Sequence, residues 1–339
     1  YSSYYVTNLD ISLLRYLTKL LSIIVKYEYV PKLFKIGIIV PIPKGDKDKS
    51  IQDNYRGITL MPVIAKVFEK WMMSRIDCWA TENKLFSQLQ GAAQPRCSSL
   101  HTAWLVREII ADNREKGNNV YVGLLDIQKA FDSVWHEGLF HKLFQYGIKG
   151  KTWRILRYLF YNFKCMVRSG NGNSRQFSAE QGIHQGSPTS MFLFQVYVNE
   201  LLCEINSKVA CVKCVGLSTG VVAFADDIAL LSNSMQGLQS LVSIAYKYSK
   251  KWRFQFNPAK CSILQFGEEN KQRIRIGPEI VKCVKQDSHL GIVLTSKSQC
   301  IDDVIHERIQ KCKNIVYATQ SLGSHNTPVT PKTSSKVYW

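Results

Sequence analysis

The sequence predicts an α+β fold in which an antiparallel sheet is backed by helices. Two short runs rich in Val, Ile and Leu, at 221–225 and 228–231, flank adjacent carboxylates, as the two strands of a hairpin would. A third apolar run, at 120–125, is long enough for a strand that is buried on both faces. Stretches with apolar residues at helical spacing occupy much of the remaining chain.

Turn and helix-breaking residues divide the chain into elements. Pro31 ends a first helix, the turn at 117–119 leads into the strand at 120–126, and Gly-Asn-Gly-Asn at 170–173 joins a hairpin. In the helix at 63–79 we expect the aromatic stripe to be core rather than a base-stacking platform. The predicted helices are 9–30, 63–79, 100–110, 137–146, 152–160, 189–205, 236–252 and 304–316, and the predicted strands are 34–43, 120–126, 164–169, 175–179, 221–225, 228–231 and 263–266.

Three acids occupy positions that suggest a metal site. Asp226 and Asp227 lie at the predicted hairpin tip, where Asp tolerates the backbone angles of a tight turn. Neighbouring carboxylates repel each other unless a cation lies between them. Asp126 ends a buried strand, where an unpartnered carboxylate is costly. If both strands belong to one sheet, the acids converge as a two-metal phosphoryl-transfer site requires; for the hairpin alone, an ordinary surface turn is the alternative.

Three segments resemble motifs A, B and C of reverse transcriptases, and in detail they are most similar to those of non-LTR (LINE-type) retrotransposons. They occur in the family's order at 126–132 (DIQKAFD), 181–188 (QGIHQGSP) and 224–227 (FADD). The resemblance implies a right-hand polymerase with fingers, palm and a partial thumb. We expect fingers with an N-terminal extension at 1–116, and a palm at 117–295 with a fingers-like helical and hairpin insertion around 137–180. The start of a thumb is expected at 296–339.

The resemblance implies an RNA-directed DNA polymerase, a nucleotidyltransferase that copies an RNA template from dNTPs. Its other partner would be a DNA primer or target DNA, and two Mg²⁺ ions, with Mn²⁺ as a substitute, would be its cofactors. The expected metal-binding residues are Asp126, Ile127, Asp226 and Asp227, of which the three acids are catalytic. Lys260, in a segment (NPAKCS, 257–262) similar to the family's D motif, would be a general acid; a solvated lysine before a strand is an equally common explanation.

Five further residues are expected to bind the incoming nucleotide. Arg56, in a segment similar to a family motif (NYRGITL, 54–60), offers a planar fork of donors for phosphate oxygens, and Lys44 in the preceding basic loop would assist it. The resemblance implies that Phe131 packs under the sugar. Gln185 can hydrogen-bond sugar or base, and Gly186 permits a close backbone approach.

Several positions depart from the family's pattern. Gly57 stands where Pro is usual, Met191 also stands where Pro is frequent, and HLGI at 289–292 has His289 in place of Tyr. The segment at 90–99 (QGAAQPRCSS) carries Ala92 and Ala93 in a Gly-Phe-Arg-like motif, in which Arg96 would touch the template backbone. These departures favour one alternative, a catalytically decayed or repurposed nucleic-acid-binding protein. A group II intron maturase-type polymerase is a second alternative.

The composition limits the kinds of binding partner to be expected. The 339 residues include 44 Lys and Arg against 26 Asp and Glu, and a formal charge of +18 favours a polyanion, of which nucleic acid is the commonest. No apolar run reaches membrane-spanning length, so we expect no membrane partner. The ten cysteines, with one CxxC at 211–214, predict free thiols in a reducing compartment. We expect an excerpt of a longer, intracellular protein acting in the nucleus or in a cytoplasmic ribonucleoprotein; its oligomeric state is left open.

Overall fold

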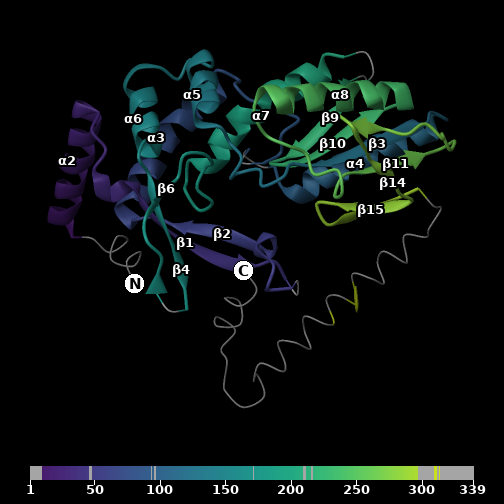
Figure 1. The fold of residues 1–339 in the computed structure, drawn as a ribbon. Coiled ribbons are helices and arrows are strands. Elements are labelled where there is room, and N and C mark those ends of the chain that lie inside the picture. The colour runs from purple at the N-terminus through teal and green to yellow at the C-terminus, as the bar shows by residue number, and fades with distance from the viewer. Residues whose placement is uncertain are drawn as a thin grey trace.

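The computed structural model describes residues 10–45, 48–92, 94, 97–170, 172–208, 211–214, 217–296, 309–310 and 313. Within these residues, helices pack beside two larger mixed sheets that lie in different parts of the molecule (Figure 1). The mixture of helices and sheets agrees with the predicted α+β class.

The first sheet carries the three acids. Its strand order is β14 (Lys282–Cys283), β11 (Ser262–Phe266), β3 (Val120–Asp126), β10 (Asp227–Ser232) and β9 (Val221–Phe224). The pairs on either side of β3 and between β10 and β9 are antiparallel. Every residue of β3 before its terminal acid is buried, as predicted for a strand covered on both faces.

Helices cover both faces of this sheet. On one face, α7 (Ser190–Asn206) and α8 (Met235–Lys251) share a hydrophobic core with alternate residues of the strands, among them Leu125 and Leu230. On the other face, α4 (Ser99–Glu115) packs against the intervening residues, such as Val122. The central strands are therefore fixed from both sides.

The second sheet is built from distant parts of the chain. β1 (Ile36–Pro43) pairs antiparallel with β2 (Tyr55–Leu60) and parallel with β4 (Lys164–Ser169). The short strands β5 (Gly172–Asn173) and β6 (Phe177–Ser178) complete it through β4. The hairpin predicted after residue 164 thus joins the sheet of β1 rather than that of the acids.

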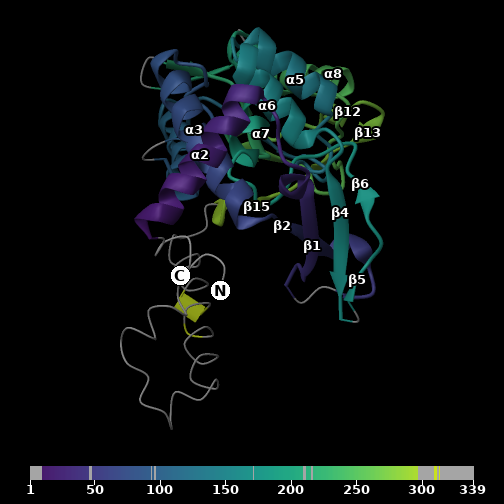
Figure 2. The ribbon, with the colours of Figure 1, turned by 90° about the vertical axis from the view of Figure 1, so that its left-hand side faces the viewer.

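Four more helices stand beside this sheet. They are α2 (Ile11–Tyr27), α3 (Val63–Glu82), α5 (His136–Gln145) and α6 (Gly150–Phe160). In both views α2 lies close to α3 and α6 (Figures 1 and 2). None of the helices within the described ranges combines the length and the apolar character that a membrane span needs.

Within the described residues, the predicted helices and strands are present, with local differences. The first helix ends at Tyr27, because Glu28 takes a left-handed φ of 58° before Pro31 is reached. The strand predicted from residue 34 begins at Ile36, after a 3₁₀ turn (Lys32–Lys35). β2 was not predicted, because Arg56 and Gly57 interrupt its apolar pattern. The helix predicted at 304–316 lies almost entirely outside the described residues.

The aromatic stripe of α3 is only partly core. Phe68, Met72 and Ile76 are buried as expected. Trp71 and Trp79 are half-buried, and Ile64 is 43% exposed. The described cysteines, including both of the CxxC pair, are free thiols.

A buried ammonium group joins three helices. Lys142 on α5 is fully buried and donates hydrogen bonds to Glu200 on α7 and to the hydroxyl of Tyr248 on α8, the latter at 2.7 Å. Its Nζ also lies 3.8 Å from the centre of the Trp252 ring. Burial lowers the pKa of Lys142 to about 8, although Glu200 acts in the opposite direction.

This burial makes stability depend on pH. The native state releases the Lys142 proton near pH 8, whereas the unfolded chain holds it to about 10.5, so between these values the unfolded state binds more protons. The free energy of unfolding should therefore rise with pH relative to Lys142→Met, by up to about 1.4 kcal/mol per pH unit. Chemical denaturation of both proteins from pH 7 to 10 measures the difference. Lys247→Met, on the exposed side of α8, controls for the lost charge. If the difference in unfolding free energy between the parent protein and Lys142→Met stayed constant across this pH range, the prediction would be contradicted.

Candidate active site

The sheet places two of the predicted acids directly opposite each other. Asp227, the first residue of β10, pairs with Asp126, the last residue of β3, and Asp226 precedes it in the turn. The main chain of Asp126 bonds to the other side: its carbonyl accepts from Asn257 N–H (2.9 Å) and its N–H donates to Cys261 Sγ (3.4 Å). Asp126 and Asp227 therefore form a non-hydrogen-bonded pair, the type in which side chains lie closest.

The electrostatics of the three acids reflect this crowding. Desolvation raises the pKa of Asp227 to about 6, and the neighbouring charges of Asp226 and Asp126 act in the same direction. Burial also raises the pKa of Asp226, while Arg56 and Lys260 lower it. Like charges directly opposite across a strand pair are destabilising, so a cation in this place would be strongly favoured.

The hairpin turn differs from the predicted one in two respects. The turn residues are Ala225 and Asp226, so Asp227 belongs to β10 rather than to the tip. The left-handed residue is Ala225, with a φ of 55°, rather than either aspartate. A residue with a Cβ is strained in this conformation, and only surrounding contacts keep it there.

Gln90 supplies those contacts. Its side-chain carbonyl accepts from Ala225 N–H (2.7 Å) and its amide donates to the Ala225 carbonyl (3.2 Å). Gln90 is 1% exposed, and its neighbours extend the sheet, since Ala223 N–H donates to Leu89 O and Gly91 N–H to Ala223 O, both at 2.8 Å. A Cβ at Gly91 would lie 2.1 Å from Thr102 Oγ1, which explains the glycine. Gln90 thus clasps the peptide groups on both sides of the strained residue.

Lysines and Arg56 border the acids. Lys260 Nζ lies 3.4 Å from Asp126 Oδ2, an ion pair without hydrogen-bond geometry, so that this buried oxygen has no hydrogen bond. Arg56 is exposed on β2, and its charge acts on Asp226.

Lys44 lies at the end of the β1–β2 hairpin. Its Nζ donates to the Asp53 carbonyl (2.8 Å), and the Asp53 carboxylate pairs with Lys129 Nζ (2.8 Å) in the motif-A segment. This hairpin therefore touches the segment that carries Asp126. Both partners of the Asp53–Lys129 pair are largely exposed, so the contact is weak.

The segment from Gln185 to Thr189 is anchored from two sides. Thr59 N–H on β2 donates to the Gln185 carbonyl (2.8 Å), and Gly186, with a φ of 112°, would place a Cβ 3.0 Å from the Thr59 carbonyl oxygen. On the other side, the carboxylate of Glu69 on α3 accepts from the hydroxyls of Ser187 and Thr189. Glu69 is 2% exposed, and burial raises its pKa.

Phe131 lies between the core and this segment. Its half-buried ring stacks on Phe194 with centroids 5.1 Å apart and an interplanar angle of 12°. Its carbonyl accepts from Ile183 N–H (2.8 Å). His184 is buried against the rings of Phe160 and Phe163, and this burial lowers its pKa to about 4.

The donor atoms suit Mg²⁺. Carboxylate and peptide oxygens are its preferred protein ligands. Backbone polar groups alternate sides along a strand, so the Ile127 carbonyl faces away from Asn257, toward the side of Asp226. In the described part of the chain no three His, Cys, Asp or Glu side chains converge on one point as they stand, and the Lys260 ammonium lies against Asp126 instead.

Sequence comparison decides the family. The family model "Reverse transcriptase (RNA-dependent DNA polymerase)" matches residues 42–294, well over half of the chain. The chain belongs to the reverse transcriptase family. It is 27% identical over 302 residues to "Probable RNA-directed DNA polymerase from transposon BS" of Drosophila melanogaster, covering 85% of this chain and 32% of that protein.

Other relatives agree with the predicted non-LTR resemblance, which is confirmed. The polymerase "from mobile element jockey" of Drosophila funebris is 24% identical, covering 83% of this chain and 31% of that protein. The Pol polyprotein of element R2 of Popillia japonica is 29% identical over 199 residues, 57% of this chain and 27% of that protein. This reverse transcriptase chain therefore spans about a third of the length of these relatives.

Solved structures agree on the fold. Apo telomerase from Candida tropicalis superposes with a TM-score of 0.56 at 12% identity, covering 85% of this chain and 53% of that one. A form truncated from the C-terminal domain gives a TM-score of 0.54 at 14% identity, covering 80% of this chain and 58% of that one. The right-hand polymerase fold predicted from the sequence is confirmed.

Sequence reasoning missed two buried polar residues of this reverse transcriptase, Gln90 and Glu69. The sequence presents Gln90 only as the first residue of the 90–99 segment and Glu69 only as one position of the helix predicted at 63–79. A polar residue inside an otherwise apolar helical face was the available signal for Glu69. Arg96, expected at the template backbone, lies outside the described residues, as does Ala93.

The two hydrogen bonds to Ala225 predict that Gln90 positions the turn that carries Asp226. Gln90→Ala should slow primer extension about 10- to 100-fold, as is typical when a residue that orients metal ligands is lost. The Mg²⁺ concentration for half-maximal extension should rise while affinity for primer–template stays unchanged. Gln94→Ala is the matched control, because Gln94 bonds to the Ser87 carbonyl in the same segment (2.9 Å). Parental kinetics and melting temperature in Gln90→Ala would show that the turn needs no clasp.

Proposed function

We propose that this chain is the polymerase core of a non-LTR retrotransposon reverse transcriptase, which copies RNA into DNA from dNTPs. The observation that carries the proposal is the strand register that pairs Asp126 with Asp227 beside Asp226. The relatives named above, which are polymerases of mobile elements, support it. Fingers at 1–116, palm at 117–295 with an insertion around 137–180, and a thumb beginning at 296 are part of the proposal.

The acids would hold the metal. Asp126, Asp226 and Asp227, with the Ile127 carbonyl, would bind two Mg²⁺ ions, for which Mn²⁺ could substitute. When bound, such ions lower the pKa of the primer 3′-hydroxyl and offset charge on the leaving pyrophosphate. Because Lys260 Nζ lies 3.4 Å from Asp126 Oδ2, the ammonium would have to move away before that oxygen could bind a metal ion.

The surrounding cations would serve the triphosphate. The guanidinium of Arg56, exposed on β2 and acting on Asp226, would bind phosphate oxygens, with Lys44 beside it at the hairpin end. Lys260, released from Asp126, would donate a proton to the leaving pyrophosphate. Gln185 and Gly186 would lie against the nucleotide or template, held there by Thr59 and Glu69.

The partners would be an RNA template and a DNA primer or target DNA. A formal charge of +18 suits such polyanions. One structural neighbour, a telomerase from Candida tropicalis, is described in complex with a fragment of telomeric RNA. A protein acting on these partners would work in the nucleus or in a cytoplasmic ribonucleoprotein.

The acids provide the direct test. Asp226→Asn should reduce extension of a DNA primer on an RNA template by roughly 10³-fold or more, because a charge needed in the transition state is lost. Affinity for primer–template, measured by fluorescence anisotropy, should change little. Asp112→Asn is the control, since Asp112 interacts with Lys116 on α4 and with Cys214, and neither contact involves the three acids. Near-parental extension by Asp226→Asn would favour the decayed, nucleic-acid-binding alternative.

Phe131 tests the choice of sugar. If its ring occupies the space of a 2′-hydroxyl, Phe131→Val should admit ribonucleotides while largely keeping use of deoxyribonucleotides. The stacking on Phe194 adds a stability loss of roughly 1–3 kcal/mol. The ratio of dNTP to rNTP incorporation efficiency measures the first effect and thermal unfolding the second. An unchanged ratio in a less stable variant would show that the ring only packs.

A further inference from the structure

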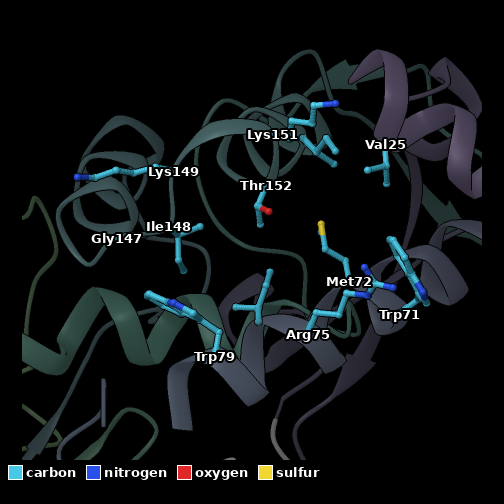
Figure 3. Close-up of a pocket in the computed structure, with 12 residues that line it drawn as sticks. Val25, Trp71, Met72, Arg75, Trp79, Gly147, Ile148, Lys149, Lys151 and Thr152 are labelled. Atoms are coloured by element: carbon cyan, nitrogen blue, oxygen red, sulfur yellow. The ribbon is translucent and has the colours of Figure 1, made fainter. Parts of the chain in front are cut away.

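A cavity of about 250 Å³ opens between α2, α3 and the start of α6 (Figure 3). None of its lining residues belongs to the strands of the acids, and Figure 1 shows those strands at the other end of the molecule. The cavity contains none of the proposed catalytic or nucleotide-binding residues, so the proposed polymerase reaction assigns it no role.

One wall is an alternation of aromatic and cationic side chains on α3. Trp71, Arg75 and Trp79 follow one another at four-residue spacing and so share a helix face. The Arg75 guanidinium lies 4.4 Å from the centre of the Trp71 ring. The buried residues Met72 and Ile76 form the floor between them. Stacked guanidinium and indole groups are surfaces on which nucleobases stack.

The opposite wall is the loop that leads into α6. Gly147 has a φ of 98°, and a Cβ there would lie 3.3 Å from Trp79, so a glycine lets the loop approach the ring. The loop and the first turn of α6 add Lys149 and Lys151 to the lining.

The described residues that line the cavity carry charge of one sign. Arg75, Lys149 and Lys151 line it, and its lining residues include no acid. Glu28, the acid at the end of α2, is bound by Arg154 (2.8 Å). The cavity therefore suits a flat, anionic group.

We propose that this cavity binds one nucleotide of a single-stranded nucleic acid segment, apart from the site of the three acids. The base would stack on the Trp71–Arg75–Trp79 wall, and Lys151 with Arg75 would neutralise its phosphates. A volume of about 250 Å³ is too small for a partner helix, which is about 10 Å across, and the lining cations disfavour an apolar peptide. The inference rests on the proposed function only for the identity of the polymer.

The test uses the full chain and a labelled single-stranded RNA of about 12 nucleotides, a length within the range such sites cover. An excess of unlabelled hairpin primer–template first occupies the proposed polymerase site, and anisotropy then follows the labelled strand. Arg75→Glu with Lys151→Glu, both exposed, should weaken binding about tenfold and reduce the slope of log K against log salt by about 1.4, or 0.7 for each phosphate contact.

Two further variants separate stacking from charge. Trp79→Leu should weaken binding about tenfold with an unchanged salt slope, because it removes a ring and no charge. Lys247→Glu with Lys250→Glu, exposed on α8, makes the same change of net charge elsewhere and should leave binding within about twofold.

Several outcomes would overturn the proposal. They are complete displacement of the labelled strand by the hairpin, unchanged binding in the Arg75 and Lys151 double variant, or an equal loss in the α8 control. Displacement by uridine monophosphate as readily as by an unlabelled strand would show a site for free nucleotides and overturn the assignment to a strand. Extension of the hairpin by the parent protein is scored separately, so that failure of the proposed polymerase function is distinguishable from failure of this site.

Discussion

Two carboxylates that repel each other are held side by side by a ladder of apolar residues. The pairing of β3 with β10 runs from Ser232–Tyr121 to Asp227–Asp126, and the residues along it are buried by helices on both faces. Burial of such residues, at roughly 25 cal/mol per Å² of apolar surface, is what offsets the repulsion at the end of the ladder. Desolvation raises the pKa of Asp227, and the charges of Asp226 and Asp126 raise it further. A cation between the acids would relieve the repulsion.

The ladder does not by itself fix the turn or the neighbouring loops. Gln90 holds the strained peptide at Ala225, and Glu69 holds Ser187 and Thr189. Both are buried and both come from the first part of the chain, far in sequence from the groups they bind. A buried polar group that loses its partner costs about 1–3 kcal/mol, so each contact strongly favours one arrangement. The N-terminal elements thus help to position the segments that carry the chemistry.

Much of this could be predicted from local pattern. Continuous apolar runs predict β3 and the β9–β10 hairpin, and a metal-site explanation of the acids follows from their chemistry alone. The left-handed residue of the turn was not predictable, because Ala225 is kept in that conformation by Gln90, which lies 135 positions away. β2 was missed for a similar reason: Arg56 and Gly57 break its pattern, and pairing with β1 makes it a strand. Partners that are distant in sequence leave no local signal.

The described cations differ in how firmly they are held. Lys142, buried among Glu200, Tyr248 and Trp252, is fixed in the core and cannot leave without exposing its partners. Lys260, paired with Asp126 at 3.4 Å without a hydrogen bond, and Lys129, paired with Asp53 in solvent, are held far more weakly. Anchored charges suit a structural role, whereas weakly held charges can exchange one anionic partner for another. We therefore assign Lys142 a structural role, whereas Lys260 and Lys129 are free to bind a phosphate.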